Sequence, residues 1–264
     1  MATGSLPDEG DLQLGSVRLP AGKRVTAGFD TTVPVAWVTR QDVPDAGRVW
    51  AALSAASPQT GLVPFLLGSL PGDARRPWDT GEFSCPADPA QLDEIDATHV
   101  IQDMWDDEMP SDDEEEDEEW AAMRAPFSNH FPGLAPPAST PLSPSELDDV
   151  LGSLPPRRIG LVPAARPADV LPLTGWTPSD QSDALPIAAV VRSWEDRFGA
   201  RLLEIGFAEF RLLASRPPRT TGHAQHLAAE QFVFCDECAG KGLHDIQAIT
   251  DHLLSSPIWT FWWD

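Results

Sequence analysis

A stretch in the middle of the chain, residues 103–156, limits most strongly how the 264 residues can fold. Its first 17 residues, 103–119, contain 12 acidic side chains and no basic one, and the remainder is rich in proline, glycine, serine and alanine. Such a composition offers little apolar surface for burial, and its like charges repel one another. We therefore predict two modules separated by a partly disordered linker. The boundaries are residues 1–105 for the N-terminal module, 106–156 for the linker and 157–264 for the C-terminal module.

The whole chain contains 41 acidic and 18 basic residues, which gives a formal net charge of −23 at pH 7. A field of this sign repels the phosphates of nucleic acids and the anionic surfaces of membranes. The best candidate for a local basic patch, Arg157 and Arg158 with Arg166, is small. We therefore expect neither nucleic acid nor a membrane as a partner, and we expect a protein partner to be basic.

The chain contains no uncharged apolar run of about 18 residues, and its N-terminus lacks the basic start and apolar segment that direct secretion. Its three cysteines, Cys85, Cys235 and Cys238, are a sparse and odd-numbered set. This usage fits a reducing compartment better than secretion. We therefore expect a cytoplasmic protein.

The C-terminal module has the clearest periodicity. Apolar residues from Ile187 to Phe198 recur on one helical face, and Gly199 follows as a stop signal. The other predicted elements are β runs at 159–163, 201–207, 210–214 and 257–264, and helices at about 224–232 and 244–254. This order predicts an α+β fold with a ferredoxin-like, split βαβ antiparallel sheet and helices on one of its faces.

The N-terminal module is predicted to be a smaller α/β unit. Residues 33–39 form a β-rich run, and residues 61–68 are typical of a buried strand. Helices are predicted over 46–56 and 88–104. The second of them begins with Asp-Pro, the order that is favoured at a helix start.

Several short segments distinguish the C-terminal module. They are Arg158–Pro163, Leu173–Trp176, Ser193–Ala200, Pro217–Pro218, Phe234–Cys235 and the terminal Trp259–Asp264. Together they resemble the bacterial domain of unknown function 4253 family over about residues 157–264. The resemblance implies an α+β fold and a bacterial origin, and it implies no activity.

Cys235 and Cys238 are separated by two residues, a spacing that allows zinc ligation or a redox couple. A structural zinc site needs four ligands, and the spacing between His244 and His252 is unusual for such a site. Cys235 also follows the end of a predicted helix, where the helix dipole disfavours a thiolate. We therefore predict ordinary cysteines, no metal site and no cofactor, with zinc binding and redox chemistry as the alternatives.

The last strand places Trp259 and Trp263 on one side and Trp262 on the other. If helices cover only one face of the sheet, one of these sets is exposed, and exposed aromatic rows are typical of binding interfaces. The alternative is that the N-terminal module or the linker covers them. On the best-defined helix, Glu195 is either an acid of raised pKa or a residue at the rim of the core. The candidate binding residues are Trp176, Arg192, Trp194, Glu195, Trp259, Trp262, Trp263 and Asp264.

The sequence contains no nucleophile elbow, P-loop or dinucleotide-binding glycine motif, so no catalytic residue can be named. We predict a non-catalytic intracellular binding protein that contacts a protein partner through its tryptophan-rich C-terminal sheet. A toxin-neutralising role would fit the size and acidity by analogy alone. The alternative is an enzyme or metal-binding module with a site near Cys235 and Cys238, in a cleft between the two halves.

Overall fold

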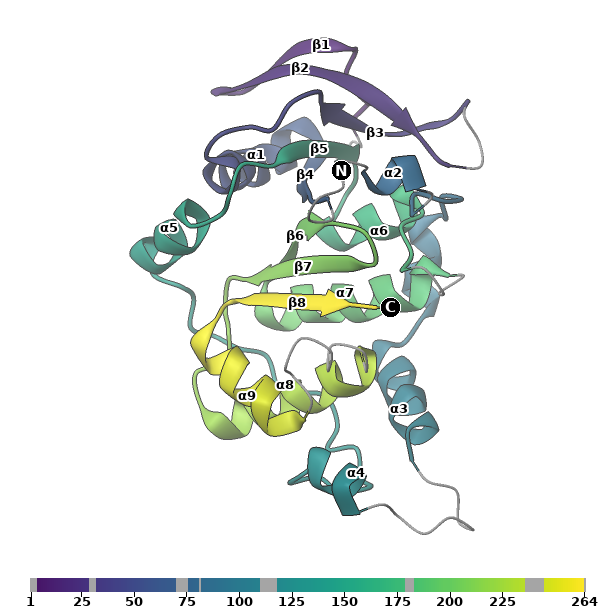
Figure 1. Cartoon of the computed structure of the whole chain (residues 1–264), viewed down its shortest axis with the longest axis vertical. Coiled ribbons are helices and arrows are strands. Elements are labelled where there is room, and N and C mark those ends of the chain that lie inside the picture. The colour runs from purple at the N-terminus through teal and green to yellow at the C-terminus, as the bar shows by residue number, and fades with distance from the viewer. Residues whose placement is uncertain are drawn as a thin grey trace.

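Eight strands form one continuous sheet in the computed structural model of the chain (Figure 1). The structure describes residues 4–28, 32–69, 76–80, 82–109, 118–178, 183–235 and 245–263. The strands are β1 (Gly10–Leu14), β2 (Val17–Thr26), β3 (Pro34–Thr39), β4 (Leu62–Leu67), β5 (Arg158–Pro163), β6 (Ala200–Ile205), β7 (Glu209–Ala214) and β8 (Ile258–Trp262). They lie in the order β1-β2-β3-β5-β4-β6-β7-β8. Neighbouring strands are antiparallel except for the parallel pair β4 and β6.

Helices cover both faces of the sheet. The α-helices are α1 (Ala46–Thr60), α2 (Pro77–Thr80), α3 (Ala97–Asp107), α4 (Glu118–Met123), α5 (Pro144–Gly152), α6 (Val170–Thr174), α7 (Ala184–Phe198), α8 (Thr221–Phe234) and α9 (Ile246–Ser255), and short 3₁₀ helices are η1 (Pro89–Glu94) and η2 (Pro167–Asp169). Buried residues of α3, α6, α7, α8 and α9 share one core with one face of the sheet. Those of α1 and α5 share a second core with the other face. Within the described ranges, no helix has the length and apolar character needed to span a membrane.

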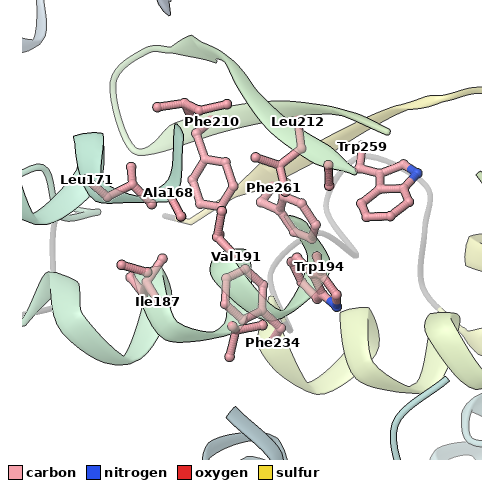
Figure 2. Packing of buried hydrophobic residues seen from close by; sticks show 14 of the residues in the cluster. Ala168, Leu171, Ile187, Val191, Trp194, Phe210, Leu212, Phe234, Trp259 and Phe261 are labelled. Atoms are coloured by element: carbon pink, nitrogen blue, oxygen red, sulfur yellow. The ribbon is translucent and has the colours of Figure 1, made fainter. Parts of the chain in front are cut away.

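Helix α7 confirms the predicted apolar stripe. At its start the Asp183 side chain accepts a hydrogen bond from the N–H of Leu185, and at its end Gly199 adopts a left-handed conformation with φ of 59°. Ile187 and Val191 point from this helix toward the sheet (Figure 2). The sequence thus determines this element locally, through its caps as well as its pattern.

The helix predicted over residues 88–104 is divided into two. Asp88 caps η1 by accepting from the N–H of Ala90, and Asp96 caps α3 by accepting from the N–H of Thr98. The second aspartate therefore starts a new helix inside the predicted span, because its side chain competes with continued helical pairing.

The strand order differs from a ferredoxin-like sandwich, and that finer prediction is not confirmed. Strand β4 lies between β5 and β6, and β8 pairs with β7 rather than with β5. The expectation of helices on one face is wrong, since Leu203 of β6 and Leu213 of β7 pack into the core that contains α1. The strand order differs because β5 pairs with β3 and β4, which both belong to the N-terminal part of the chain.

Parts of the predicted linker pack on the two cores: Phe127 and Phe131 lie against the first, and Leu151 is buried in the second. Residues 110–117 of the acidic run are outside the described residues. Helix α5 begins with a capping box between Ser143 and Glu146. Arg48 of α1 donates two hydrogen bonds to Asp148 of α5, at 2.7 and 3.0 Å. These bonds hold α5 against α1 on the second face of the sheet.

Candidate ligand pocket

A proline interrupts the parallel pair β4 and β6. The strands pair at their C-terminal ends, where Leu66 lies opposite Glu204 and Leu67 opposite Ile205. Two residues before Leu66, Pro64 has no N–H to donate to a neighbouring strand. The two strands therefore separate toward their N-terminal ends, and residues of both line the cavity there.

Trp50 of α1 joins the two strands where their pairing stops. Its indole N–H donates to the carbonyl oxygen of Pro64 at 3.1 Å and to that of Leu202 at 3.2 Å. The tryptophan is buried, and it lines the cavity. One side chain thus compensates for the missing main-chain bond and forms part of the pocket floor.

The cavity has a volume of about 270 Å³, which suits a small ligand. Its apolar lining comes from Trp50, Pro58, Val63, Pro64 and Leu202, and its polar lining from Ser54, Ser57, Arg166, Glu195 and Arg201. The first four apolar residues and both serines belong to the N-terminal part of the chain, and Leu202 and the three charged residues belong to the C-terminal part. The pocket therefore exists only where the two parts meet.

Glu195 and Arg166 form an ion pair on one wall of the pocket. Arg166 Nε donates to Glu195 Oε1 at 3.2 Å, and the N–H of Ala168 donates to Oε2 at 3.1 Å. Burial raises the pKa of the Glu195 carboxyl above its ordinary value, and the charge of Arg166 and the Ala168 N–H act in the opposite direction. Both oxygens of Glu195 are engaged, so this carboxylate positions Arg166.

Arg166 is kept charged by its partners. Burial lowers the pKa of this guanidinium, but the charges of Glu195 and Asp196 and their hydrogen bonds outweigh burial, so the pKa is raised overall. Arg201, at the start of β6, differs from Arg166. Its side chain is exposed, and within the described part of the chain it has no ion-pair or hydrogen-bond partner. Arg201 is therefore the cation of this pocket that a ligand can use.

We predict that Trp50→Phe lowers the free energy of unfolding by about 1 to 3 kcal/mol more than Trp259→Phe does. The two substitutions remove the same volume from buried sites. The N–H of Trp50 has two acceptors, whereas the N–H of Trp259 has none among the described residues. Urea unfolding of both variants measures the difference. Equal losses would show that the bridge between the strands contributes nothing.

The aromatic row of the last strand belongs to the core. Trp176, Trp194 and Trp259 are fully buried, and Trp263 is 8% exposed. The ring of Trp194 stacks on Phe261 at 5.2 Å between α7 and the sheet (Figure 2). The cover comes mainly from α7 and α8 of the C-terminal part, and residues of the N-terminal module, among them Phe83 and Trp105, share the same core. These four tryptophans therefore form no exposed binding surface.

The remaining predicted site residues are dispersed. Trp262 is half-buried on the opposite side of β8, and its main-chain N–H donates to Cys235 Sγ at 3.3 Å. Arg192 is used by two carboxylates, those of Asp93 and Asp169, each at 2.7 Å. Asp264 lies outside the described residues. Of the members of the predicted set that the structure describes, only Glu195 lines the pocket.

Cys235 is not part of the pocket lining. Cys235 is buried and takes part in a disulfide bond, and Cys85 is a free, exposed thiol. Cys238 and His244 lie outside the described residues, and His252 contacts the carbonyl oxygen of Ile258 at 3.0 Å. Among the residues that the structure describes, no three His, Cys, Asp or Glu side chains are grouped to hold a metal ion.

The charged residues of the pocket lie in a part of the chain that matches a known family model. Residues 158–264 match the family model described as Domain of unknown function (DUF4253). The resemblance predicted from the sequence is thereby confirmed for this part of the chain. Arg166, Glu195 and Arg201 all belong to the DUF4253 region, whereas Trp50 and Pro64 precede it. Searches of curated proteins and of solved structures found no match.

Sequence reasoning missed most of the pocket. Pro64 was a usable signal, because a proline inside a buried strand indicates a missing main-chain bond. Trp50 and Arg201 carried no such signal, since a tryptophan on an amphipathic helix and an arginine at a strand start are ordinary core and surface residues. Only the fold brings these residues of the N-terminal part and the DUF4253 region together.

Proposed function

We propose that the protein is a non-catalytic binding protein, and that its ligand is a small carboxylate with an apolar body held in the pocket between β4 and β6. The single observation that supports this most strongly is Arg201. It is an exposed guanidinium at the edge of an apolar cavity, and no acceptor for it exists among the described residues. A charge-assisted hydrogen bond to a carboxylate is the strongest contact that this group can make.

The pocket supplies the other features that such a ligand requires. The ring of Trp50 and the side chains of Val63 and Pro64 provide an apolar floor. The hydroxyl of Ser54 and the guanidinium of Arg201 provide polar contacts on the walls. Ligand sites commonly combine a mostly apolar lining with a few placed polar groups.

The lining argues against catalysis. Among the described residues it contains no histidine and no cysteine, so Ser54 and Ser57 have no neighbouring base to activate them. The one carboxylate, Glu195, accepts hydrogen bonds on both oxygens. Arg166 pairs with this carboxylate at 3.2 Å, so its negative charge is already compensated before a ligand binds.

The proposal is tested with benzoate, which combines a carboxylate with a flat apolar ring. We predict that Arg201→Ser weakens benzoate binding at least about tenfold, because a hydrogen bond between charged groups contributes about 1.5 to 3 kcal/mol. Titration of the labelled protein with benzoate, followed by NMR, gives the dissociation constant of each variant. Arg18→Ser is the matched control, since Arg18 is an exposed arginine on β2, outside the pocket.

We expect Arg18→Ser to bind benzoate with the same affinity as the unchanged protein. Equal affinities of all three proteins would mean that benzoate binds elsewhere. No binding of benzoate to the unchanged protein would contradict the proposed ligand class.

A further inference from the structure

A strap, residues 134–142, crosses α7 and α8 without forming a helix or a strand. It is part of the teal chain that leads from α4 past α8 to α5 (Figure 1). Three of its nine residues are prolines, at 136, 137 and 141. The strap precedes the DUF4253 region, and the residues that hold it belong to that region.

The first contacts are made by the main chain around Ala135. The N–H of Ala135 donates to Glu230 Oε1 at 2.7 Å, and its carbonyl oxygen accepts from Arg197 Nη1 at 2.9 Å. The carbonyl oxygen of Pro136 contacts Nε2 of His223 at 2.7 Å. Side chains of α7 and α8 thus bind the strap through its peptide groups.

The rest of the strap is also bound through its peptide groups. The N–H of Ala138 donates to the carbonyl oxygen of Arg197 at 2.9 Å, and the carbonyl oxygen of Ala138 accepts from Arg216 Nε at 3.0 Å. The N–H of Leu142 donates to the carbonyl oxygen of Ser215 at 2.8 Å. Recognition of peptide groups in this way depends little on side-chain identity.

The face that binds the strap contains a fully buried carboxylate. Glu230 accepts from Trp194 Nε1 at 2.8 Å and from both terminal nitrogens of Arg197, at 2.8 and 2.6 Å. A buried charge pair is costly unless every polar atom is satisfied, and the N–H of Ala135 supplies the remaining donor. The face is therefore organised around one peptide N–H of the strap.

The strap side chains that are buried are small. Ala135 is 1% exposed and Ala138 is 9% exposed. A larger side chain at either position would contact the face before the peptide groups could reach it. The face therefore selects a proline-rich segment with small residues three positions apart.

We propose that this face is a recognition site for proline-rich peptide segments, and that the strap occupies it as a ligand within the same chain. A partner protein that presents a proline-rich segment with the same pattern of small residues competes with the strap. The competition favours the strap, because a tethered segment has an effective concentration of the order of millimolar. The site goes beyond the ligand pocket, with which it shares none of the contacts given above.

The test uses a fluorescent peptide with the sequence of residues 131–143 and a full-length variant, Ala135→Asp. The main-chain N–H of Ala135 bonds the Glu230 carboxylate at 2.7 Å, so a second carboxylate at position 135 is expected to repel Glu230 and release the strap, while no residue of the face itself is replaced. Fluorescence anisotropy is expected to show at least about tenfold tighter peptide binding to the variant than to the unchanged protein, because the tethered competitor is removed. The peptide carrying the same Ala135→Asp change is expected not to bind.

The face itself is tested by adding His223→Ala to the strap variant, which removes the contact between His223 and the carbonyl oxygen of Pro136. The affinity for the peptide is expected to fall about threefold or more. Circular dichroism establishes that each variant is folded. A folded strap variant that binds neither peptide, or both equally, would overturn the proposal.

A second measurement needs no substitution. In the unchanged protein, about 1 mM unlabelled peptide is expected to accelerate hydrogen exchange of the Ala138 amide, since the peptide displaces the strap from its carbonyl acceptor. The Asp-containing peptide serves as the control at the same concentration. An unchanged exchange rate at Ala138 with both peptides would contradict the proposal.

Discussion

Replacing Glu230 by alanine is expected to lower the free energy of unfolding by about 3 to 5 kcal/mol. The carboxylate of Glu230 is fully buried and accepts hydrogen bonds from Trp194, Arg197 and the main chain of Ala135. Removing it leaves the guanidinium of Arg197 without its buried counter-charge, and an uncompensated buried charge is strongly destabilising. Urea unfolding followed by circular dichroism measures the loss.

Asp103→Ala provides the control for the Glu230 variant. Asp103 is an exposed acid on α3, so its removal is expected to change the free energy of unfolding by no more than about 0.5 kcal/mol. Glu230→Gln retains the size of the side chain and should fall between these two variants. A loss for Glu230→Ala as small as that for Asp103→Ala would show that the buried network does not stabilise the fold.

The second large effect is expected for Trp259→Ala, at about 3 to 5 kcal/mol of lost unfolding free energy. Trp259 is fully buried, and its ring packs against those of Trp194 and Phe198, with ring centroids 6.0 and 5.6 Å apart. Truncation leaves a cavity in the core that α7 shares with the sheet (Figure 2). Thermal or urea unfolding of the purified variant gives the value.

Trp262→Ala is matched to this variant in residue type and in strand. Trp262 is only half-buried and lies on the other side of β8, so we expect a loss below about 2 kcal/mol. The comparison distinguishes a core role from a binding role for the aromatic row. A larger loss for Trp262 than for Trp259 would contradict the assignment of Trp259 to the core.

The sequence predicted most elements of the C-terminal part because their signals are local. The apolar stripe of α7 and its terminal Gly199 predicted that helix, and β-rich runs predicted β5 to β8. The alternation along the last strand also predicted correctly which tryptophans share a side. What local signals cannot give is the pairing of strands that are distant in sequence.

The observed topology differs from the predicted ferredoxin-like one in the pairing of its strands. The sequence of β5 is compatible with several neighbours, and in the fold it pairs with β3 and β4, which are far away along the chain. The same long-range pairing brings Trp50 next to Arg201. A candidate site made from two distant segments therefore cannot be predicted from local patterns along the sequence.

A basic protein partner remains a prediction from the net charge of −23. The buried tryptophans cannot provide its contact surface, because α7 and α8 cover them. The strap-binding face offers a different kind of protein contact, through peptide groups rather than aromatic side chains.

The most direct test of the central claim is an isotope-filtered NOE spectrum of the labelled protein with saturating benzoate. Trp50→Phe assigns the ring protons of Trp50 among the ten tryptophans. We expect NOEs from the benzoate ring to Trp50 and Val63, which line the pocket. NOEs that connect bound benzoate only to residues outside this cavity would contradict the proposed function.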